Sequence, residues 1–159
     1  MSGTANVINL TIPAKPEYVG IARLTSSGVA NRMGYSYDDI EDIKIAVSEA
    51  CTNAVNHAYK KHDEGMIDLR IECRQDAMSI MVIDKGESFN YEDVIGKLKP
   101  LDPTISLNQV NEGGLGLFLI NTLMDEVTIS SDRGVVVKMI KLLNRDEVDH
   151  YANKVSTTE

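Results

Sequence analysis

At Glu112-Gly113-Gly114-Leu115-Gly116-Leu117 the chain carries three glycines directly before the apolar residues Phe118-Leu119-Ile120. The apolar residues predict a helix, and glycine lets the backbone at its start approach a ligand closely. The first amides of a helix are unpaired and lie at its positive end, so this stretch suits an anion, above all a phosphate. Glycine clusters also cap helices and form turns, and the stretch alone leaves that alternative open.

A long amphipathic helix is predicted from Asp38 to Tyr59. Asp38 is a suitable N-terminal cap, and apolar residues recur at the spacing of one helix face, at Ile40, Ile43, Val47, Cys51, Ala54, Val55 and Ala58. Glu49, Asn53 and His57 follow one another at intervals of four, so they project from one side in a row about 12 Å long. A carboxylate, an amide and an imidazole on one stripe indicate a binding site, although a solvated helix face shows the same spacing.

A hydrophobic strand is predicted from Met78 to Ile83, and it ends in Asp84-Lys85-Gly86. Strand ends of this kind often carry ligand contacts. An ordinary turn is the alternative, because Asp and Gly are common turn residues.

Taken in chain order, these segments resemble the nucleotide-binding motifs of one superfamily. They look like the motifs of the Bergerat-fold (GHKL) ATPases and kinases. The motifs are Glu-x-x-x-Asn-x-x-x-His on a helix, Asp-x-Gly after a strand, a variable loop, and then Gly-Gly-Leu-Gly-Leu. That superfamily contains gyrase, the heat-shock ATPase chaperone, mismatch-repair ATPases and histidine kinases. More narrowly, residues 46–55, 13–34 and 134–143 are similar to the anti-sigma factor serine kinases of Gram-positive bacteria, above all the anti-sigma-B factors of the general stress response.

The resemblance implies both a fold and a function. The expected fold is α+β, a two-layer sandwich with helices on one face of a mixed, mostly antiparallel sheet. One kinase domain is expected at residues 1–143, followed by a polar tail at 144–159. The implied protein is a homodimer that sequesters a sigma-B-like sigma factor and uses ATP to phosphorylate a serine of its anti-anti-sigma antagonist.

The resemblance also implies a role for each site residue. Asn53 would bind Mg²⁺ and ATP or ADP, Glu49 would be the general base toward the serine hydroxyl, and Asp84 would accept a hydrogen bond from the adenine amino group. Gly86 would let the base approach. The other expected nucleotide-binding residues are His57, Gly113, Gly114, Gly116 and Leu117.

The sequence departs from the family pattern in two places. Many relatives have a threonine near the adenine in the final strand, whereas here Gly134 is followed by three valines. Some relatives have an arginine just before the glycine run, whereas this chain has Glu112. Lys97 or Lys99 could supply the missing cation, although a solvated lysine is the more ordinary interpretation.

The remaining elements follow from periodicity and turn residues. Strands are expected at residues 6–12, 66–73, 127–131 and 135–143, and further helices at 16–33 and 115–124. Periodicity is absent from Glu87 to Asn111, a length typical of a lid, so this segment is expected to cover the nucleotide.

Composition agrees with a single cytoplasmic domain. The chain has 159 residues with 43% hydrophobic content, no apolar run long enough to span a bilayer and no secretion signal. Its formal charge of −8 argues against a nucleic-acid binder, which needs a basic surface. Cys51 and Cys73 are expected to be buried reduced thiols.

Two functional hypotheses remain. A serine kinase that also holds a sigma factor is favoured by Glu49, and the alternative is a nucleotide-gated, partner-switching module without transferase activity. A histidine kinase would need a phosphoacceptor histidine in an upstream dimerisation domain, but the only histidines are His57, His62 and His150. Arg23 interrupts the apolar face of the helix at 16–33 and could anchor an acidic partner or extend from the edge of the core.

Overall fold

The computed structural model describes residues 5–60, 65–85, 99–100, 114–130 and 135–144. Along this part of the chain the elements are β1 (Asn6–Pro13), η1 (Pro16–Tyr18), α1 (Val19–Met33), α2 (Tyr37–Lys60), β2 (Met66–Cys73), β3 (Ala77–Lys85), β4 (Lys99–Pro100), α5 (Gly114–Leu123), β5 (Glu126–Ser130) and β6 (Val136–Leu142).

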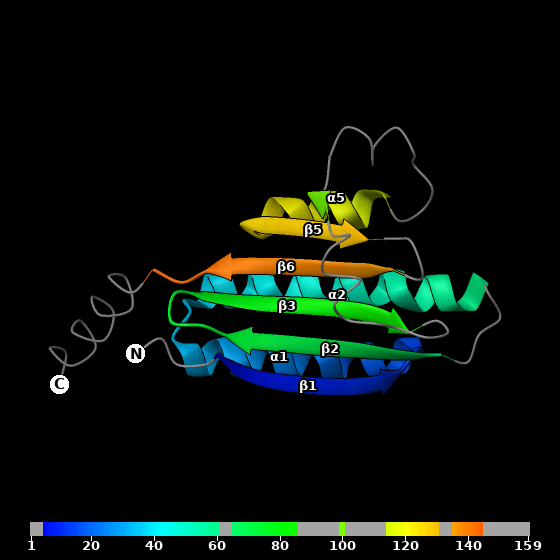
Figure 1. Cartoon of the computed structure of the whole chain (residues 1–159), viewed down its shortest axis with the longest axis horizontal. Coiled ribbons are helices and arrows are strands. Elements are labelled where there is room, and N and C mark those ends of the chain that lie inside the picture. Colours follow the sequence, from blue (N-terminus) through cyan, green and yellow to red (C-terminus); the bar gives the residue numbers. More distant parts are fainter. Residues whose placement is uncertain (1–4, 61–64, 86–98, 101–113, 131–134, 145–159) are drawn as a thin grey trace, which may run out of the picture.

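The described strands form one six-stranded sheet in the order β1-β2-β3-β6-β5-β4. Its described pairings are all antiparallel, so the parallel pairing expected of a mixed sheet is not found among them. In Figure 1 the helices α1, α2 and α5 all lie behind the strands. The predicted α+β two-layer sandwich is therefore confirmed.

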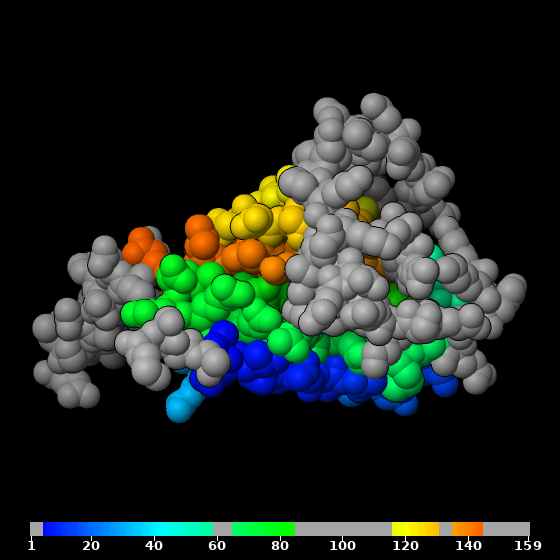
Figure 2. Space-filling view, in the orientation of Figure 1, coloured from blue at the N-terminus to red at the C-terminus, as the bar shows by residue number. Residues whose placement is uncertain are grey.

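The core lies between the helices and the sheet. Alternate residues of β2 point toward the helices, and Ile67, Leu69 and Ile71 are fully buried. Opposite them, α2 buries the apolar face predicted from its sequence, including Ile43 and Val47. Figure 2 shows the face of the sheet away from the helices, where the side chains of β1, β2 and β3 lie next to one another.

Two helix ends show how the sequence sets the boundaries. Gly34 ends α1 with φ 100°, and its N–H donates to the carbonyl oxygens of Ala30 and Asn31, which is a conformation that glycine adopts without strain. The prediction that Asp38 caps α2 is wrong, because the helix already begins at Tyr37. The Oγ of Ser36 accepts the cap hydrogen bond from the N–H of Asp39, at 3.2 Å.

The other element predictions agree with the structure to within a few residues. Part of the expected lid is a strand: Lys99 and Pro100 pair with β5 as β4, while the rest of residues 87–111 lies outside the described residues. Of the expected tail, only Asn144 is described, and it is exposed. Within the described ranges, no helix has the length and apolarity needed to cross a membrane.

Candidate functional site

The stripe on α2 and the glycine-rich start of α5 lie against each other. A Cβ atom added to Gly116 would lie 2.9 Å from Oε2 of Glu49, and 3.4 and 3.5 Å from Nδ2 and Oδ1 of Asn53. A side chain at this position would therefore have to displace the Glu49 carboxylate, so glycine leaves that carboxylate in its place beside α5. Two motifs that are far apart in the sequence therefore meet in one site.

The stripe is positioned by the burial of α2. Val47, Cys51, Ala54 and similar residues pack into the core, which leaves Glu49, Asn53 and His57 half-buried along the flank of the helix that faces α5. Asn53 has an unusual amide: its Nδ2 is buried and has no hydrogen-bond partner among the described residues. A buried donor without a partner is unfavourable in a folded protein, and it commonly marks a binding site.

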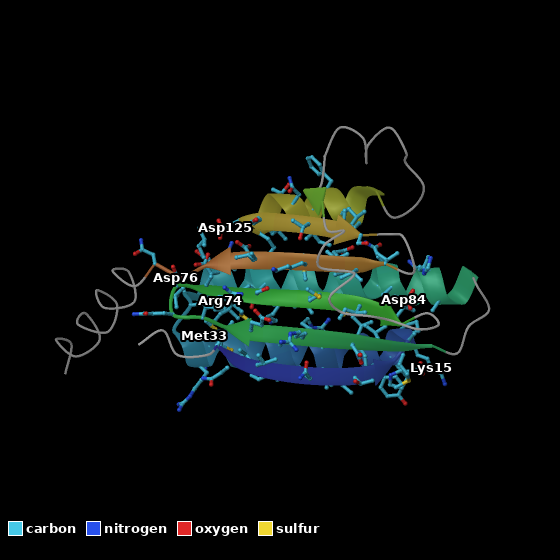
Figure 3. The ribbon with its side chains drawn as sticks, viewed as in Figure 1. Lys15, Met33, Arg74, Asp76, Asp84 and Asp125 are labelled. Carbon is cyan, nitrogen blue, oxygen red and sulfur yellow. The ribbon has the colours of Figure 1, made fainter. Side chains whose placement is uncertain are left out.

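Asp84 lies at the C-terminal end of β3, next to α2 (Figure 3). The residue is buried, with 5% of its surface exposed. Its Oδ2 lies 2.6 Å from Nδ1 of His57, and its N–H donates to the carbonyl oxygen of Val135 at 3.0 Å. The acid at the end of the strand is thus joined to the last residue of the α2 stripe.

The described part of the glycine run forms the first turn of α5. The helix begins at Gly114, so its first unpaired amides lie close to Gly116 and the α2 stripe. Leu117 is half-buried and packs against the hydrophobic core, which anchors the first turn of α5 to the core. Gly86, Gly113 and Glu112 lie outside the described residues, as do Lys97 and Gly134.

The arrangement combines three chemical functions in one place. The start of α5 offers amide donors and the positive end of a helix to an anion. Glu49 and Asn53 offer a carboxylate and an amide within contact distance of that turn. Asp84, at the end of β3, offers a buried acceptor beside His57, the last residue of the α2 stripe. The site can therefore hold a ligand that has an anionic end and a hydrogen-bonding end, such as a nucleotide.

Two contacts of the helices that build the site could not be read from the sequence motifs. The first is the hydrogen bond between His57 and Asp84, because sequence spacing does not show which strand faces which turn of α2. The second is Lys141, whose Nζ donates to the carbonyl oxygen of Leu123 at the end of α5, at 2.6 Å. A signal for Lys141 was present, since it occupies an inward position in the alternation of Val137 and Met139.

A groove lies on the neighbouring flank of α2. It has a volume of about 420 Å³ and runs between the start of α1 and α2, with Arg23, Ser48, Thr52 and Asn56 among its lining residues. Arg23 is exposed, so its side chain extends into solvent rather than into the core.

Comparison with known proteins assigns the chain to a family. The family described as "Histidine kinase-like ATPase domain" matches residues 12–141. The chain is 52% identical to the serine-protein kinase RsbW of Bacillus subtilis, over 94% of each chain. It is 53% identical to the serine-protein kinase RsbW of Halalkalibacterium halodurans, over 96% of this chain and 93% of the relative.

A solved structure supports the fold. The crystal structure of the RsbU and RsbW domains of Rv1364c from Mycobacterium tuberculosis matches with a TM-score of 0.60 at 20% identity. The match covers 86% of this chain and 32% of that longer one. The family match and the identity of more than half of the residues to two RsbW kinases show that the chain belongs to the histidine kinase-like ATPase family, among its RsbW-type serine-protein kinases.

Proposed function

We propose that this protein is an anti-sigma factor and a serine kinase. It binds ATP between α2, β3 and α5, phosphorylates a serine of an anti-anti-sigma protein, and sequesters an alternative, sigma-B-like sigma factor in the cytoplasm. One observation carries the proposal: a Cβ atom at Gly116 would meet Glu49 and Asn53, so the start of an anion-binding helix lies beside a carboxylate and an amide. Membership of the serine-protein kinase family supports the same activity.

The residues of the site fit a magnesium-bound nucleotide. Asn53 ends in a buried amide whose nitrogen has no hydrogen-bond partner in the described part of the chain, and its oxygen is a hard ligand of the kind that Mg²⁺ prefers. In the described part of the chain, no group of three His, Cys, Asp or Glu side chains could hold a metal alone. This suits Mg²⁺, which takes most of its oxygens from phosphates and water in such sites. Asn53 is therefore assigned as the protein ligand.

The chain's own residues then carry out phosphoryl transfer. The amides at the start of α5 stabilise the negative phosphate oxygens, and bound Mg²⁺ neutralises part of the same charge. Glu49 accepts the proton of the serine hydroxyl. At the same time the serine oxygen bonds to the γ-phosphorus, and the bond between that phosphorus and the ADP leaving group breaks. The lack of a Cβ atom at Gly116 leaves room for Oε2 of Glu49 beside the phosphate-binding turn.

Base recognition is assigned to the other end of the stripe. Asp84 accepts a hydrogen bond from the adenine amino group, and Gly86 gives the base room to approach. The phosphate-binding turn contains Gly113, Gly114, Gly116 and Leu117. The glycines contribute their backbones to the turn, and Leu117 contributes packing. His57 lies next to Asp84 and is assigned to the same nucleotide site.

Two surfaces are proposed for protein partners. The groove that contains Arg23 lies beside the α2 stripe, so an acidic segment bound there would bring its serine close to Glu49. A second groove, of about 680 Å³, lies between β1 and α1, and its lining includes Ile8, Leu24 and Val29. Leu24 is 68% exposed, and burial of this apolar groove against a second copy would form the expected homodimer.

The proposal is tested with the purified protein, ATP, Mg²⁺ and a candidate anti-anti-sigma protein. We expect calorimetry to show ATP binding and mass spectrometry to show phosphoserine on the partner only when ATP is present. Binding without phosphoserine would favour the alternative, a nucleotide-gated module without transferase activity. Absence of ATP binding would contradict both.

A further inference from the structure

His57 and Asp84 form a direct contact between α2 and β3. Nδ1 of His57 lies 2.6 Å from Oδ2 of Asp84, with side-chain exposures of 30% and 7%. A contact this short between a ring nitrogen and a buried carboxylate is a charge-assisted hydrogen bond, in which Nδ1–H donates. One of the two carboxylate oxygens is therefore already bonded within the protein.

The bond leaves Oδ1 as the carboxylate oxygen of Asp84 that has no partner among the described residues. The backbone N–H of Asp84 is also engaged, since it donates to the carbonyl oxygen of Val135. Of the described residues, only His57 hydrogen-bonds the carboxylate. An ionised carboxylate accepts hydrogen bonds but donates none. With Oδ2 bonded to the imidazole, the direction in which Oδ1 accepts is fixed.

His57 lies toward the base end of the site rather than the phosphate end. The side-chain atoms nearest to Gly116, which marks the phosphate-binding turn, belong to Glu49 and Asn53. His57 is four residues beyond Asn53, about 6 Å further along α2. Its observed partner, Asp84, is the residue assigned to the nucleobase.

We propose that His57 is a positioning residue that sets the base specificity of the site by orienting Asp84. The imidazole holds the carboxylate so that Oδ1 faces a hydrogen-bond donor at position 6 of a purine. A 6-aminopurine offers that donor, whereas a 6-oxopurine offers an acceptor and is rejected. This inference rests on the proposed function, because it requires a nucleotide with its base at Asp84.

The test compares the affinities of ATP and inosine triphosphate, which has an oxygen at position 6. Three variants separate the two ring nitrogens of His57. In His57→Asn the amide can occupy the position of Nδ1 and still donate to Asp84. In His57→Gln the amide lies where Nε2 was, and in His57→Leu neither donor is present.

We expect His57→Leu to weaken ATP binding about tenfold and to leave inosine triphosphate binding within about twofold. His57→Asn should restore the preference for ATP to within about threefold of the natural protein, whereas His57→Gln should not. The ratio of the two affinities does not depend on how much of a variant is folded. Restoration by Gln alone would indicate a phosphate contact through Nε2 and would overturn the proposal, as would equal ratios in all variants.

A double-mutant cycle tests whether His57 acts through Asp84. In an Asp84→Ala background, His57→Leu should produce no further loss of ATP preference, and an additive loss contradicts the proposal. A readout without nucleotide is also available, because the chain has three histidines and their ring nitrogens can be resolved by NMR of ¹⁵N-labelled protein. The signal of the protonated Nδ1 of His57 should shift in Asp84→Ala.

The experiments distinguish a failure of the proposed function from a failure of the role of His57. If the natural protein binds neither triphosphate, the proposed function and this inference both fall. If it binds and prefers ATP but the three variants retain that preference, only the role of His57 falls. Glu41→Gln, in the first half of α2 where Glu41 pairs with Lys44, serves as a control that should keep the natural ratio.

Discussion

A Cβ atom at Gly116 would lie 2.9 Å from Oε2 of Glu49. That separation is shorter than real side chains tolerate, so a methyl group here must displace the carboxylate. The displaced atom is the end of a flexible side chain, and its movement costs little folding free energy. The position of the proposed base therefore depends on the lack of a side chain on a different helix.

Gly116→Ala should consequently damage catalysis more than stability. Moving a catalytic group by about 1 Å can lower a rate by about a hundredfold, and we expect phosphoryl transfer to fall by about 10- to 100-fold. The free energy of unfolding should change by less than about 1 kcal/mol, because alanine also favours the helix. Urea unfolding and single-turnover transfer measure the two effects, and a stability loss without a rate loss would contradict the placement of Glu49.

Gly28→Ala is the matched control for a glycine in a helix. A Cβ at Gly28, in the middle of α1, would meet no atom within 4 Å. The substitution should therefore raise the free energy of unfolding by about 0.5 to 1 kcal/mol and leave transfer of phosphate unchanged.

Glu49→Ala should separate binding from chemistry. The variant loses the group that accepts the serine proton, so transfer should slow by about 10² to 10⁴, the usual contribution of a general base. Nucleotide binding should stay within about threefold of the natural protein. Quench-flow and calorimetry measure the two quantities.

Asp84→Asn provides the opposite profile for comparison. An amide at this position cannot replace both acceptor oxygens of the carboxylate, and ATP binding should weaken by about tenfold to a hundredfold. Equal losses of binding in Glu49→Ala and Asp84→Asn would show that the two carboxylates do not have distinct roles.

The elements of the fold were predictable where periodicity was strong. The α2 helix and strand β2 appear nearly at their expected bounds because their apolar residues follow one period throughout. The cap of α2 was mispredicted because Ser36 and Asp38 are both good caps, and only the backbone decides between them. Strand β4 was missed because two residues carry no period.

The site was predictable as a set of motifs but not as a set of contacts. Helical spacing placed Glu49, Asn53 and His57 on one flank, and the structure keeps them there. The pairing of His57 with Asp84 depends on how α2 packs across β3, which involves residues 27 positions apart and has no local signal. The same is true of the approach of Gly116 to Asn53.

The Glu72 carboxylate makes stability depend on pH. Burial alone would raise its pKa, but hydrogen bonds from Arg74 and Arg70 outweigh burial and lower the pKa below the ordinary 4.5. A lowered pKa in the folded state stabilises the protein above pH 4.5, and this contribution is lost as the pH falls through the folded pKa. Glu72→Gln should therefore cost about 0.2 to 1 kcal/mol at pH 7 and progressively less below pH 4.5.

Urea unfolding of the natural protein and of Glu72→Gln measures the difference in unfolding free energy. The measurements cover about pH 3 to pH 8 in even steps, a range that includes the titration of the carboxylate. In an Arg70→Gln, Arg74→Gln background only burial acts on the carboxylate and raises its pKa, so the pH dependence of the same substitution should reverse in sign. A difference that does not change with pH would show that the ion pairs do not stabilise the fold.

Lys141 joins the far ends of the two helices that build the site. Its Nζ donates to the carbonyl oxygen of Leu123 at 2.6 Å and lies 3.4 and 3.8 Å from carboxylate oxygens of Asp42 and Asp39 in α2. Lys141→Met leaves a helix-end carbonyl without its donor, so we expect a loss of about 1 to 3 kcal/mol in unfolding free energy and faster hydrogen exchange in α5. Lys138→Met, on the other face of β6, should cost less than about 0.5 kcal/mol, because that face lies away from the helices. Equal losses in the two variants would mean that the ammonium group does not hold α5 in place.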